Sequence, residues 1–530
     1  MMVAVIGSGV AGISAAHALI NRGCFVTILD VGETIDLERN TVVDWSSTVA
    51  GREESLNGER VLRSRRLPEK LHFGSDYIYA YDRSYALTTA LDSPYPTFAK
   101  GGFSNIWGAA VLPTDRCDMA DWPVPRDELE PYFRKAAELL PLTGGTGTLS
   151  QSFPAYKELL GEIDPGPQGR LFLDDLQRAE ARLLMAGTLY GRARLAVHSE
   201  PGEGEVLPCN GCGQCSFGCA RGSIFSTVPM LDGMIRRKEL VYRSGIFVSR
   251  IAETNGKAII EGIELPTMSR VRLVYEAVFV AAGPINTTRL LLRSRELYNR
   301  PVRLKESQKF VLPMLRRRSA ATTWEIPSVT LAAAFIETKV RVLSDHWVHA
   351  QIVSMNRTIC DNLPLVWSAN PTGRKLWGPM LRHVMAAWCG LHSDHSSHLE
   401  IRLSPGCNGR PDRLRIESQV STEARAAAHT VAKHLFQKGR LFDTLFCYWM
   451  PRFSYPGRAT HCGSAFPMRN RPIGEFDSDR FGRPFDWSRI FVVDSSILPS
   501  IPGTTTVFPV MANAYRIASE APLEVGRSAT

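Results

Sequence analysis

The stretch MVAVIGSGVAG at residues 2–12 decides the fold. Residues 2–6 are apolar throughout, as in a central strand of a parallel sheet, and a glycine triplet follows at once. An alanine-rich segment from residue 13 to about residue 21 predicts a helix, and residues 25–29 predict the next strand. The order strand, tight turn, helix, strand is typical of a dinucleotide-binding βαβ unit.

Four residues of this unit are candidate cofactor-binding residues. Gly7 permits the tight turn, Gly9 lets the backbone approach a pyrophosphate, and Gly12 lets the helix pack close to the sheet. The helix N-terminus favours phosphate charge. Asp30, at the end of the second strand, is placed to accept hydrogen bonds from a ribose. This pattern does not distinguish FAD from NAD.

Length and composition describe an ordinary globular enzyme of more than one domain. The chain has 530 residues, 44% hydrophobic and 22% charged, which predicts two to four domains. No apolar run approaches the roughly 18 residues of a membrane span. Because a core strand begins at residue 2 and the cysteine count is odd, at 11, we expect no secretory signal, reduced thiols and a cytoplasmic location.

Four further segments carry a recognisable pattern. They are KGGFSNIWG at 100–108, VFVAAGP at 278–284, HCGSAFPM at 461–468 and FVVDSSILP at 491–499. In their order and spacing these segments resemble the glucose–methanol–choline (GMC) oxidoreductases, a family of FAD-dependent enzymes. The resemblance extends over nearly the whole chain, although residues of about 300–390 match by position alone.

The resemblance implies a particular FAD site. Residues Gly101, Gly102, Ser104 and Asn105 would run beside the flavin and its pyrophosphate. Some family members attach FAD through a histidine in this loop, and residues 105–107 here are Asn, Ile and Trp, so we expect non-covalent FAD. Two more residues are assigned by position in the pattern, namely Val248 for backbone contact to adenine and Asp494 at the end of a strand beside the ribityl chain.

The family interleaves its two domains along the chain. The expected fold class is α/β, with a Rossmann-like FAD-binding domain and an α+β substrate domain built on an antiparallel sheet. The FAD domain would comprise residues 1–118, 200–300 and 455–530, and the substrate domain residues 119–199 and 301–454. Residues 399–403 alternate like a half-exposed strand, and residues 422 to about 438 predict a helix that ends at Gly439.

The candidate catalytic residues follow from the chemistry of alcohol oxidation. Hydride leaves the carbon only as the hydroxyl proton is lost, so a base is needed, and histidine suits that task near neutral pH. His461 matches the active-site histidine of the family. Most members have a second His or Asn about forty-five residues on, where this chain has GTTTVFP at 503–509. Thr505 and Thr506 are candidates to hydrogen-bond the substrate oxygen, or they only cap the following helix.

The cysteine-rich stretch PCNGCGQCSFGC at 208–219 is the most unusual. Its spacing, C-x2-C-x2-C-x3-C, matches that of bacterial ferredoxins, although Ala220 stands where a proline usually follows. Cys209, Cys212, Cys215 and Cys219 are candidate ligands of an iron–sulfur cluster or of zinc. A loop of free thiols is the third interpretation. The stretch HSDHSSH at 392–398 also looks metal-binding, but a polar turn before a strand is the favoured interpretation.

The sequence thus predicts FAD-dependent oxidation of an alcohol, such as a sugar or polyol, by hydride transfer to flavin N5. An unidentified acceptor would reoxidise the flavin. One alternative is a flavin-containing lyase of the same fold with no net redox change. A more remote one is a nucleic-acid-binding protein, suggested by the net charge of +9, but the basic residues are scattered and no nucleic-acid partner is expected.

Overall fold

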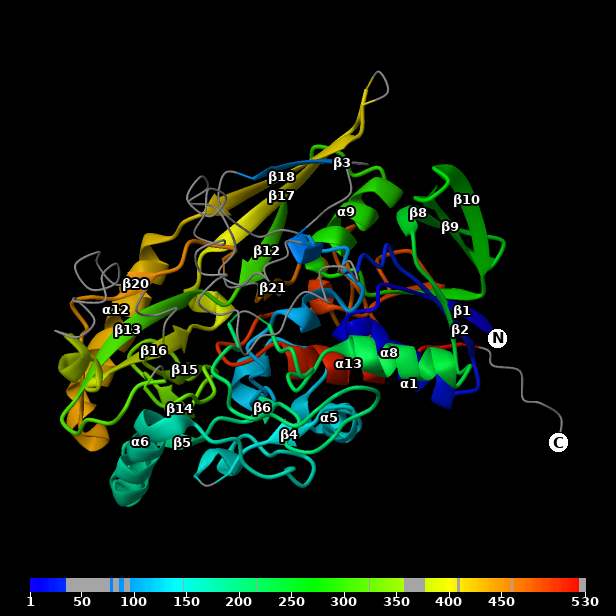
Figure 1. Cartoon of the computed structure of the whole chain (residues 1–530). Helices are drawn as coiled ribbons and strands as arrows, with labels where there is room; N and C mark the ends of the chain where they lie inside the picture. The colour runs from blue at the N-terminus through cyan, green and yellow to red at the C-terminus, as the bar shows by residue number, and fades with distance from the viewer. Residues whose placement is uncertain are drawn as a thin grey trace.

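The computed structural model describes residues 1–34, 77–79, 85–89, 96–145, 147–216, 218–323, 325–356, 377–407, 410–458 and 461–523. Two large sheets organise these residues. Figure 1 shows the sheet that contains β1 and β2 on the right of the molecule and the sheet that contains β13, β15 and β16 on the left.

The first large sheet is parallel and contains the N-terminal strand at its centre. Its order is β22 (Ile490–Val492), β11 (Ala277–Val280), β1 (Met2–Ile6), β2 (Phe25–Leu29) and β7 (Val241–Arg243). Helix α1 (Val10–Asn21) packs on α13 (Val507–Glu520), which also packs on α5 (Arg126–Glu138). The central strands are buried on both faces, which explains why they are apolar at every position.

A small antiparallel sheet lies beside the parallel one. It consists of β8 (Ile246–Thr254), β9 (Lys257–Glu264) and β10 (Ser269–Tyr275). The pairing of β8 with β9 is interrupted by a bulge between Val248 and Arg250. Helix α9 (Pro284–Ser294), which follows β11, packs on β8.

The second large sheet is antiparallel and consists of seven strands. They are β19 (Thr444–Phe446), β13 (Lys309–Arg316), β16 (Val384–Gly390), β15 (Trp347–Ser354), β14 (Ala334–Lys339) and β5 (Thr188–Arg192), with β20 (Arg452–Phe453) also paired to β13. Apolar residues of α6 (Gly166–Arg178) and α12 (Thr422–Gln437) form one core with its strands. Since side chains alternate along a strand, the other residues of each strand point to the opposite face.

A five-stranded sheet connects the two ends of the molecule. Its order is β21 (Cys462–Gly463), β12 (Val302–Glu306), β17 (His398–Ser404), β18 (Asp412–Gln419) and β3 (Tyr85–Thr89). The remaining helices and strands are α7 (Glu180–Met185), α8 (Thr227–Arg236), β4 (Leu142–Thr143) and β6 (Leu195–Ala196).

The fold class predicted from the sequence is confirmed, because a parallel Rossmann-like sheet and an antiparallel substrate-domain sheet are both present. The domain boundaries stay a prediction. Helix α13 begins at Val507, so Pro509 lies in its first turn, where a missing N–H removes no helical hydrogen bond. Within the described ranges, no helix has the length and apolarity to cross a bilayer, and no disulfide joins the cysteines.

Candidate active site

The turn after β1 is shaped by its glycines. Gly7 has a φ of +100°, and a Cβ there would lie 2.5 Å from the carbonyl oxygen of Ala281. A Cβ on Gly12 would lie 2.0 Å from the carbonyl oxygen of Gly7. On Gly9 the nearest atom to a Cβ would be the carbonyl oxygen of Gly101, at 4.0 Å. Gly7 and Gly12 are therefore required for packing, whereas Gly9 leaves open space at the N-terminus of α1.

Asp30 lies at the end of β2, where the sequence predicts a ribose contact. The hydroxyl of Ser8 donates to Oδ2 of Asp30, and the hydroxyl of Tyr242 lies 3.5 Å from the same oxygen. Burial raises the pKa of Asp30 to about 6, although the Ser8 hydrogen bond opposes this shift. Ser8 also accepts a hydrogen bond from the backbone N–H of Gly101 at 2.8 Å, which ties this turn to the second glycine loop.

The second glycine loop faces the first. Gly101 and Gly102 have φ values of +81° and +57°, and a Cβ on Gly102 would lie 3.6 Å from the Cα of Gly9. The hydroxyl of Ser104 donates to the carbonyl of Gly101 at 2.6 Å, and the amide of Asn105 donates to the carbonyl of Gly102 at 3.0 Å. Ser104 and Asn105 therefore hold the shape of the loop from within.

Asp494 and Val248 lie on different elements, Asp494 after the edge strand β22 and Val248 on β8 of the small antiparallel sheet. Asp494 follows β22 and accepts hydrogen bonds from the N–H of Gly283, at 2.9 Å, and from the hydroxyl of Thr287 at the start of α9. Burial raises the pKa of Asp494, and these donors oppose the rise. The carbonyl of Val248 accepts a hydrogen bond from Arg289 at 2.9 Å, beside the bulge of β8.

His461 immediately precedes β21, at the edge of the five-stranded sheet. Its backbone carbonyl accepts a hydrogen bond from the N–H of Ser307 at 2.9 Å. The ring atom Nδ1 is buried and has no hydrogen-bond partner in the described part of the chain. Burial lowers the pKa of His461 well below 6.5, and the charge of Lys309 lowers it further. The imidazole is therefore neutral near pH 7, with a nitrogen available to accept a proton.

A row of residues on the antiparallel sheet was missed by the sequence-based reasoning. In the strand register, Lys309 on β13 lies opposite Gly390, Gly390 lies opposite His349, and His349 lies opposite Glu337. Their strand neighbours Phe310, Ala350 and Ile336 belong to the core with α6 and α12. The row thus lies on the other face of the sheet. Lys309 and His461 are close enough to His349 to lower its pKa electrostatically.

Within this row, Lys309 reaches across Gly390. A Cβ on Gly390 would lie 2.3 Å both from Nζ of Lys309 and from the carbonyl oxygen of Gly503. Nζ donates to that carbonyl at 3.1 Å and to the hydroxyl of Ser307 at 3.2 Å. Burial lowers the pKa of Lys309 to about 8, although Glu337 opposes the shift. Lys309 still carries most of its positive charge at pH 7.

Glu337 and His349 form a fully buried pair. Nδ1 of His349 lies 2.5 Å from Oε1 of Glu337. Burial raises the pKa of Glu337 well above 4.5 and lowers that of His349 well below 6.5, so burial favours the neutral form of both groups. Nε2 of His349 and Oε2 of Glu337 have no hydrogen-bond partner among the described residues. A charged residue inside an otherwise apolar strand was the available signal, but register is not readable from one sequence.

The three threonines before α13 have different environments. The hydroxyl of Thr505 accepts from the N–H of Leu112 at 2.8 Å and donates to its carbonyl at 3.1 Å. Thr506 occupies the N-cap position of α13, and its side chain makes no capping hydrogen bond in the described structure. The hydroxyl of Thr504 is buried and lacks a partner within the described ranges. The hydroxyl of Thr505 is therefore engaged by the backbone of Leu112, whereas the hydroxyl of Thr504 is free to hydrogen-bond a ligand.

The cysteine loop brings its four thiols near one another without forming a compact single-ion site. Burial raises the pKa of Cys209 to about 11, and Cys215, Cys219 and Cys212 each add to the rise. In the described residues, however, no three of these sulfurs lie within 4.8 Å of one another. Zinc bound at about 2.3 Å would hold thiolate sulfurs about 3.8 Å apart. Zinc would thus require the loop to rearrange.

Comparisons with known proteins agree with this architecture. No family model matches the chain. It is 23% identical over 548 residues to an uncharacterized GMC-type oxidoreductase of Sinorhizobium fredii. The alignment covers 98% of this chain and 94% of that protein.

Solved structures of low identity share the fold over 97% of this chain. Pyridoxine 4-oxidase from Mesorbium loti superposes with a TM-score of 0.60 at 14% identity over 98% of its own chain. Formate oxidase from Aspergillus oryzae gives 0.61 at 12% identity over 97% of its chain. An FAD-dependent oxidoreductase from Chaetomium thermophilum gives 0.55 at 13% identity over 98% of its chain.

The parallel sheet and the paired glycine loops form the arrangement of a dinucleotide-binding domain. The residues present fit FAD, because Gly9 leaves open space at a helix N-terminus facing Gly102, and Asp30 ends the adjoining strand. Over nearly its full length the chain is similar in sequence to a GMC-type oxidoreductase, and it shares its fold with two solved oxidases and an FAD-dependent oxidoreductase.

Proposed function

We propose that this protein oxidises an alcohol carbon of a hydroxylated small molecule to a carbonyl, with His461 as the base. The observation that carries the proposal is the state of His461. It is a neutral imidazole with an unpartnered buried nitrogen, beside a positive Lys309, in the described part of the chain. Bound FAD would supply the acceptor, at flavin N5, for the hydride that leaves the alcohol carbon.

The residues around His461 have complementary tasks. The neutral imidazole accepts the hydroxyl proton as the C–H bond breaks. Nζ of Lys309 is fixed by the carbonyl of Gly503 and the hydroxyl of Ser307, so it offers a preorganised positive charge to the developing alkoxide. Because Lys309 also lowers the pKa of His461, it keeps the base unprotonated before the substrate binds.

His349 is the best candidate for the second polar partner that GTTTVFP does not provide. Its Nε2 lacks a partner among the described residues, and it is an electrostatic neighbour of His461. In a neutral pair, the protonated carboxyl of Glu337 donates a hydrogen bond to Nδ1 of His349. The ring proton of His349 is then on Nε2, which can donate a hydrogen bond to the substrate. Thr504 offers a second unpartnered hydroxyl, whereas Thr505 is engaged by Leu112 and Thr506 remains a candidate from sequence alone.

The attachment of FAD is proposed to be non-covalent. The loop that faces Gly9 carries Asn105, Ile106 and Trp107, and none of these side chains is a histidine able to form the bond. Asn105 instead donates to carbonyls of its own loop. Acid precipitation should release the flavin into the supernatant, and flavin retained in the pellet would contradict this part of the proposal.

The cysteine loop is proposed as an electron exit, if it binds an iron–sulfur cluster. The alternative is a loop of free thiols with no redox role. Anaerobic protein with a cluster would contain several irons per chain and absorb broadly near 400 nm beyond the flavin bands, as thiolate-ligated iron does. Iron and zinc analysis of one anaerobic preparation separates these alternatives, since a structural loop holds neither metal.

The test of the main proposal is anaerobic flavin reduction by a substrate panel. The panel should contain sugars, polyols and aromatic alcohols. Pyridoxine and formate are added because two proteins of similar fold are named pyridoxine 4-oxidase and formate oxidase. We expect at least one alcohol to bleach the flavin and to yield one carbonyl product per flavin. A compound that is converted while the flavin stays oxidised would instead favour the lyase alternative.

A further inference from the structure

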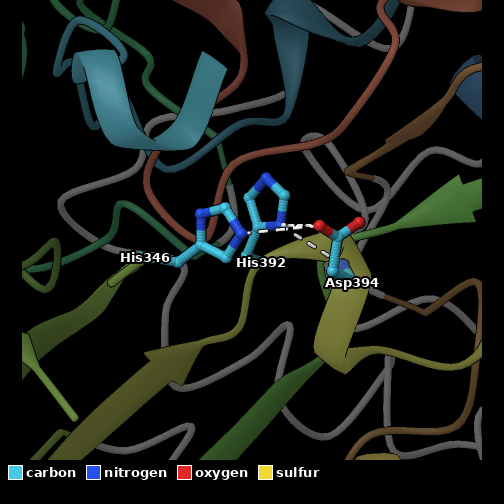
Figure 2. A group of neighbouring side chains, drawn as sticks. All are labelled: His346, His392 and Asp394. Atoms are coloured by element: carbon cyan, nitrogen blue, oxygen red, sulfur yellow. Dashed lines mark hydrogen bonds and ion pairs between the residues drawn. The ribbon is translucent and has the colours of Figure 1, made fainter. Parts of the chain in front are cut away.

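Two imidazoles and a carboxylate converge at a point that the proposed reaction does not use. Figure 2 shows His346, which immediately precedes β15, with His392 and Asp394 from the turn between β16 and β17. Nε2 of His346 lies 3.4 Å from Oδ2 of Asp394, and Nδ1 of His392 lies 3.5 Å from the same oxygen. The two rings stack with centroids 3.6 Å apart.

His346 is oriented by a second carboxylate. Its Nδ1 lies 3.1 Å from Oδ1 of Asp118, a residue that is fully buried. The same oxygen accepts the backbone N–H of Trp347 at 3.1 Å, which fixes the carboxylate in place. An ionised carboxylate only accepts hydrogen bonds, so Nδ1 of His346 carries the proton. The lone pair of a neutral His346 is then on Nε2, facing Asp394.

His392 also presents a lone pair. Its Nδ1 accepts a hydrogen bond from the backbone N–H of Asp394 at 3.3 Å, so Nδ1 holds no proton in this arrangement. His392 is 2% exposed. Three possible ligand atoms, Nε2 of His346, Nδ1 of His392 and Oδ2 of Asp394, thus lie close together. Because the two rings are stacked with 13° between their planes, a cation bound to all three atoms would turn one ring out of the stack and replace the hydrogen bond from the N–H of Asp394 to His392.

We propose that His346, His392 and Asp394 bind one divalent transition-metal cation of the Zn²⁺ type. Two imidazoles and one carboxylate form a ligand set that such cations prefer and that Mg²⁺ and Ca²⁺ do not. Ligand atoms of the three residues all lie within 4.8 Å of one another. The Asp118–His346 contact is the carboxylate–histidine arrangement that commonly supports a metal ligand. The side chain of Asp394 is 50% exposed, which gives an ion its entry path.

A proton on His346 is the competing occupant. Burial lowers the pKa of His346, but hydrogen bonds to Asp118 and Asp394 outweigh this effect and raise it to about 9. An imidazolium between two carboxylates would satisfy Asp394 without any metal. Direct measurement of metal binding separates the two occupants.

The site would brace a loop beside the candidate active site. Ser393 donates its N–H to the carbonyl of Ile501 at 2.9 Å, and the N–H of Ile501 donates to the hydroxyl of Ser393 at 3.0 Å. A Cβ on Gly503 would lie 3.1 Å from the backbone nitrogen of His392. A metal at His392 and Asp394 would therefore hold the chain that leads to Thr504. This effect does not depend on the proposed alcohol oxidation.

The experiment is zinc binding to the FAD-loaded protein after removal of metal with a chelator. Cys209→Ser and Cys212→Ser are introduced first, because the cysteine loop is a second candidate zinc site. Calorimetric titration with Zn²⁺ near neutral pH should give about one equivalent, with an accompanying rise of the thermal midpoint. Asp394→Asn, at a half-exposed position, should weaken binding about 10-fold or more, and Asp118→Asn about 10- to 100-fold.

His398→Ala is the matched control, since His398 lies in the same stretch but outside the cluster. It should keep the affinity of the Cys209→Ser, Cys212→Ser protein. His346→Gln should also weaken zinc binding, with the thermal midpoint in chelator as its folding check. Absence of zinc uptake, or uptake that Asp394→Asn and His346→Gln leave unchanged, would overturn the site and leave a proton as its occupant.

Discussion

The two ends of this molecule satisfy their polar groups in opposite ways. In the cofactor region, the side chains of Ser8, Ser104 and Asn105 are hydrogen-bonded to neighbouring backbone or side-chain atoms. On the face of the antiparallel sheet opposite α6 and α12, His349 and Glu337 each leave a buried polar atom without a partner in the described structure. The polar side chains of the two glycine loops are paired, while the row on the antiparallel sheet has unused hydrogen-bonding capacity.

The difference indicates which region meets a variable ligand. Buried polar groups are nearly always hydrogen-bonded, and an unpartnered one costs about 1–3 kcal/mol, so several at one place call for an explanation. A substrate hydroxyl that reaches His461, His349 and Lys309 would satisfy them. The glycine loops need no such completion, because their polar side chains are already paired, and we propose that their backbone passes close to a pyrophosphate.

Removal of the base should have the largest effect. His461→Ala should slow anaerobic flavin reduction about 100-fold or more, because loss of a general base typically costs that much. FAD should stay bound, since His461 lies outside the glycine loops. Stopped-flow absorbance at the flavin band measures the rate, and His398→Ala serves as the control. Reduction at the unaltered rate would remove His461 from the mechanism.

The glycines of the first loop should separate folding from cofactor binding. In Gly12→Ala, the new Cβ would meet the carbonyl oxygen of Gly7 at 2.0 Å, so we expect a loss of about 1–3 kcal/mol in unfolding free energy even without FAD. Gly9→Ala meets nothing closer than 4.0 Å in the protein and should unfold normally. It should nonetheless bind FAD more weakly, as flavin fluorescence titration would show. Equal FAD affinity in Gly9→Ala would contradict the pyrophosphate assignment.

The same contrast explains what the sequence could predict. The cofactor region is encoded locally: strand, glycine turn, helix and Asp30 follow one another within thirty residues, so spacing alone identifies them. The row from Lys309 to Glu337 spans four strands, and only the register brings Lys309, Gly390, His349 and Glu337 side by side. His461 was found through family resemblance. A single sequence offers no comparable signal for pairings between distant strands.

The threonines before α13 sharpen the contrast within one short segment. Thr505→Val removes both hydrogen bonds to Leu112 and leaves a buried N–H and C=O unpaired, so it should cost about 1–3 kcal/mol of stability. Thr504→Val removes no hydrogen bond among the described residues and should leave stability within about 0.5 kcal/mol. If Thr504 contacts substrate, its variant should raise KM with little change in denaturation. Equal stability of the two variants would contradict these hydrogen-bond assignments.

The smallest expected effect tests whether the buried pair of Glu337 and His349 is neutral. Because burial raises the pKa of Glu337 well above 4.5, the folded protein holds a proton there that the unfolded chain releases above pH 4.5. The unfolded state then binds fewer protons, so this carboxyl makes the protein less stable as the pH rises from 4.5 toward its folded pKa, by up to about 1.4 kcal/mol per pH unit.

Glu337→Gln cannot lose a proton and should remove that slope. At pH 5 the Gln amide can still donate to Nδ1 of His349, so the variant should be within about 1 kcal/mol of the natural protein and should gain on it at pH 8. Urea denaturation at both pH values measures the difference. A loss of about 3–5 kcal/mol at both would instead mean that Glu337 and His349 form a buried ion pair, which Gln would break.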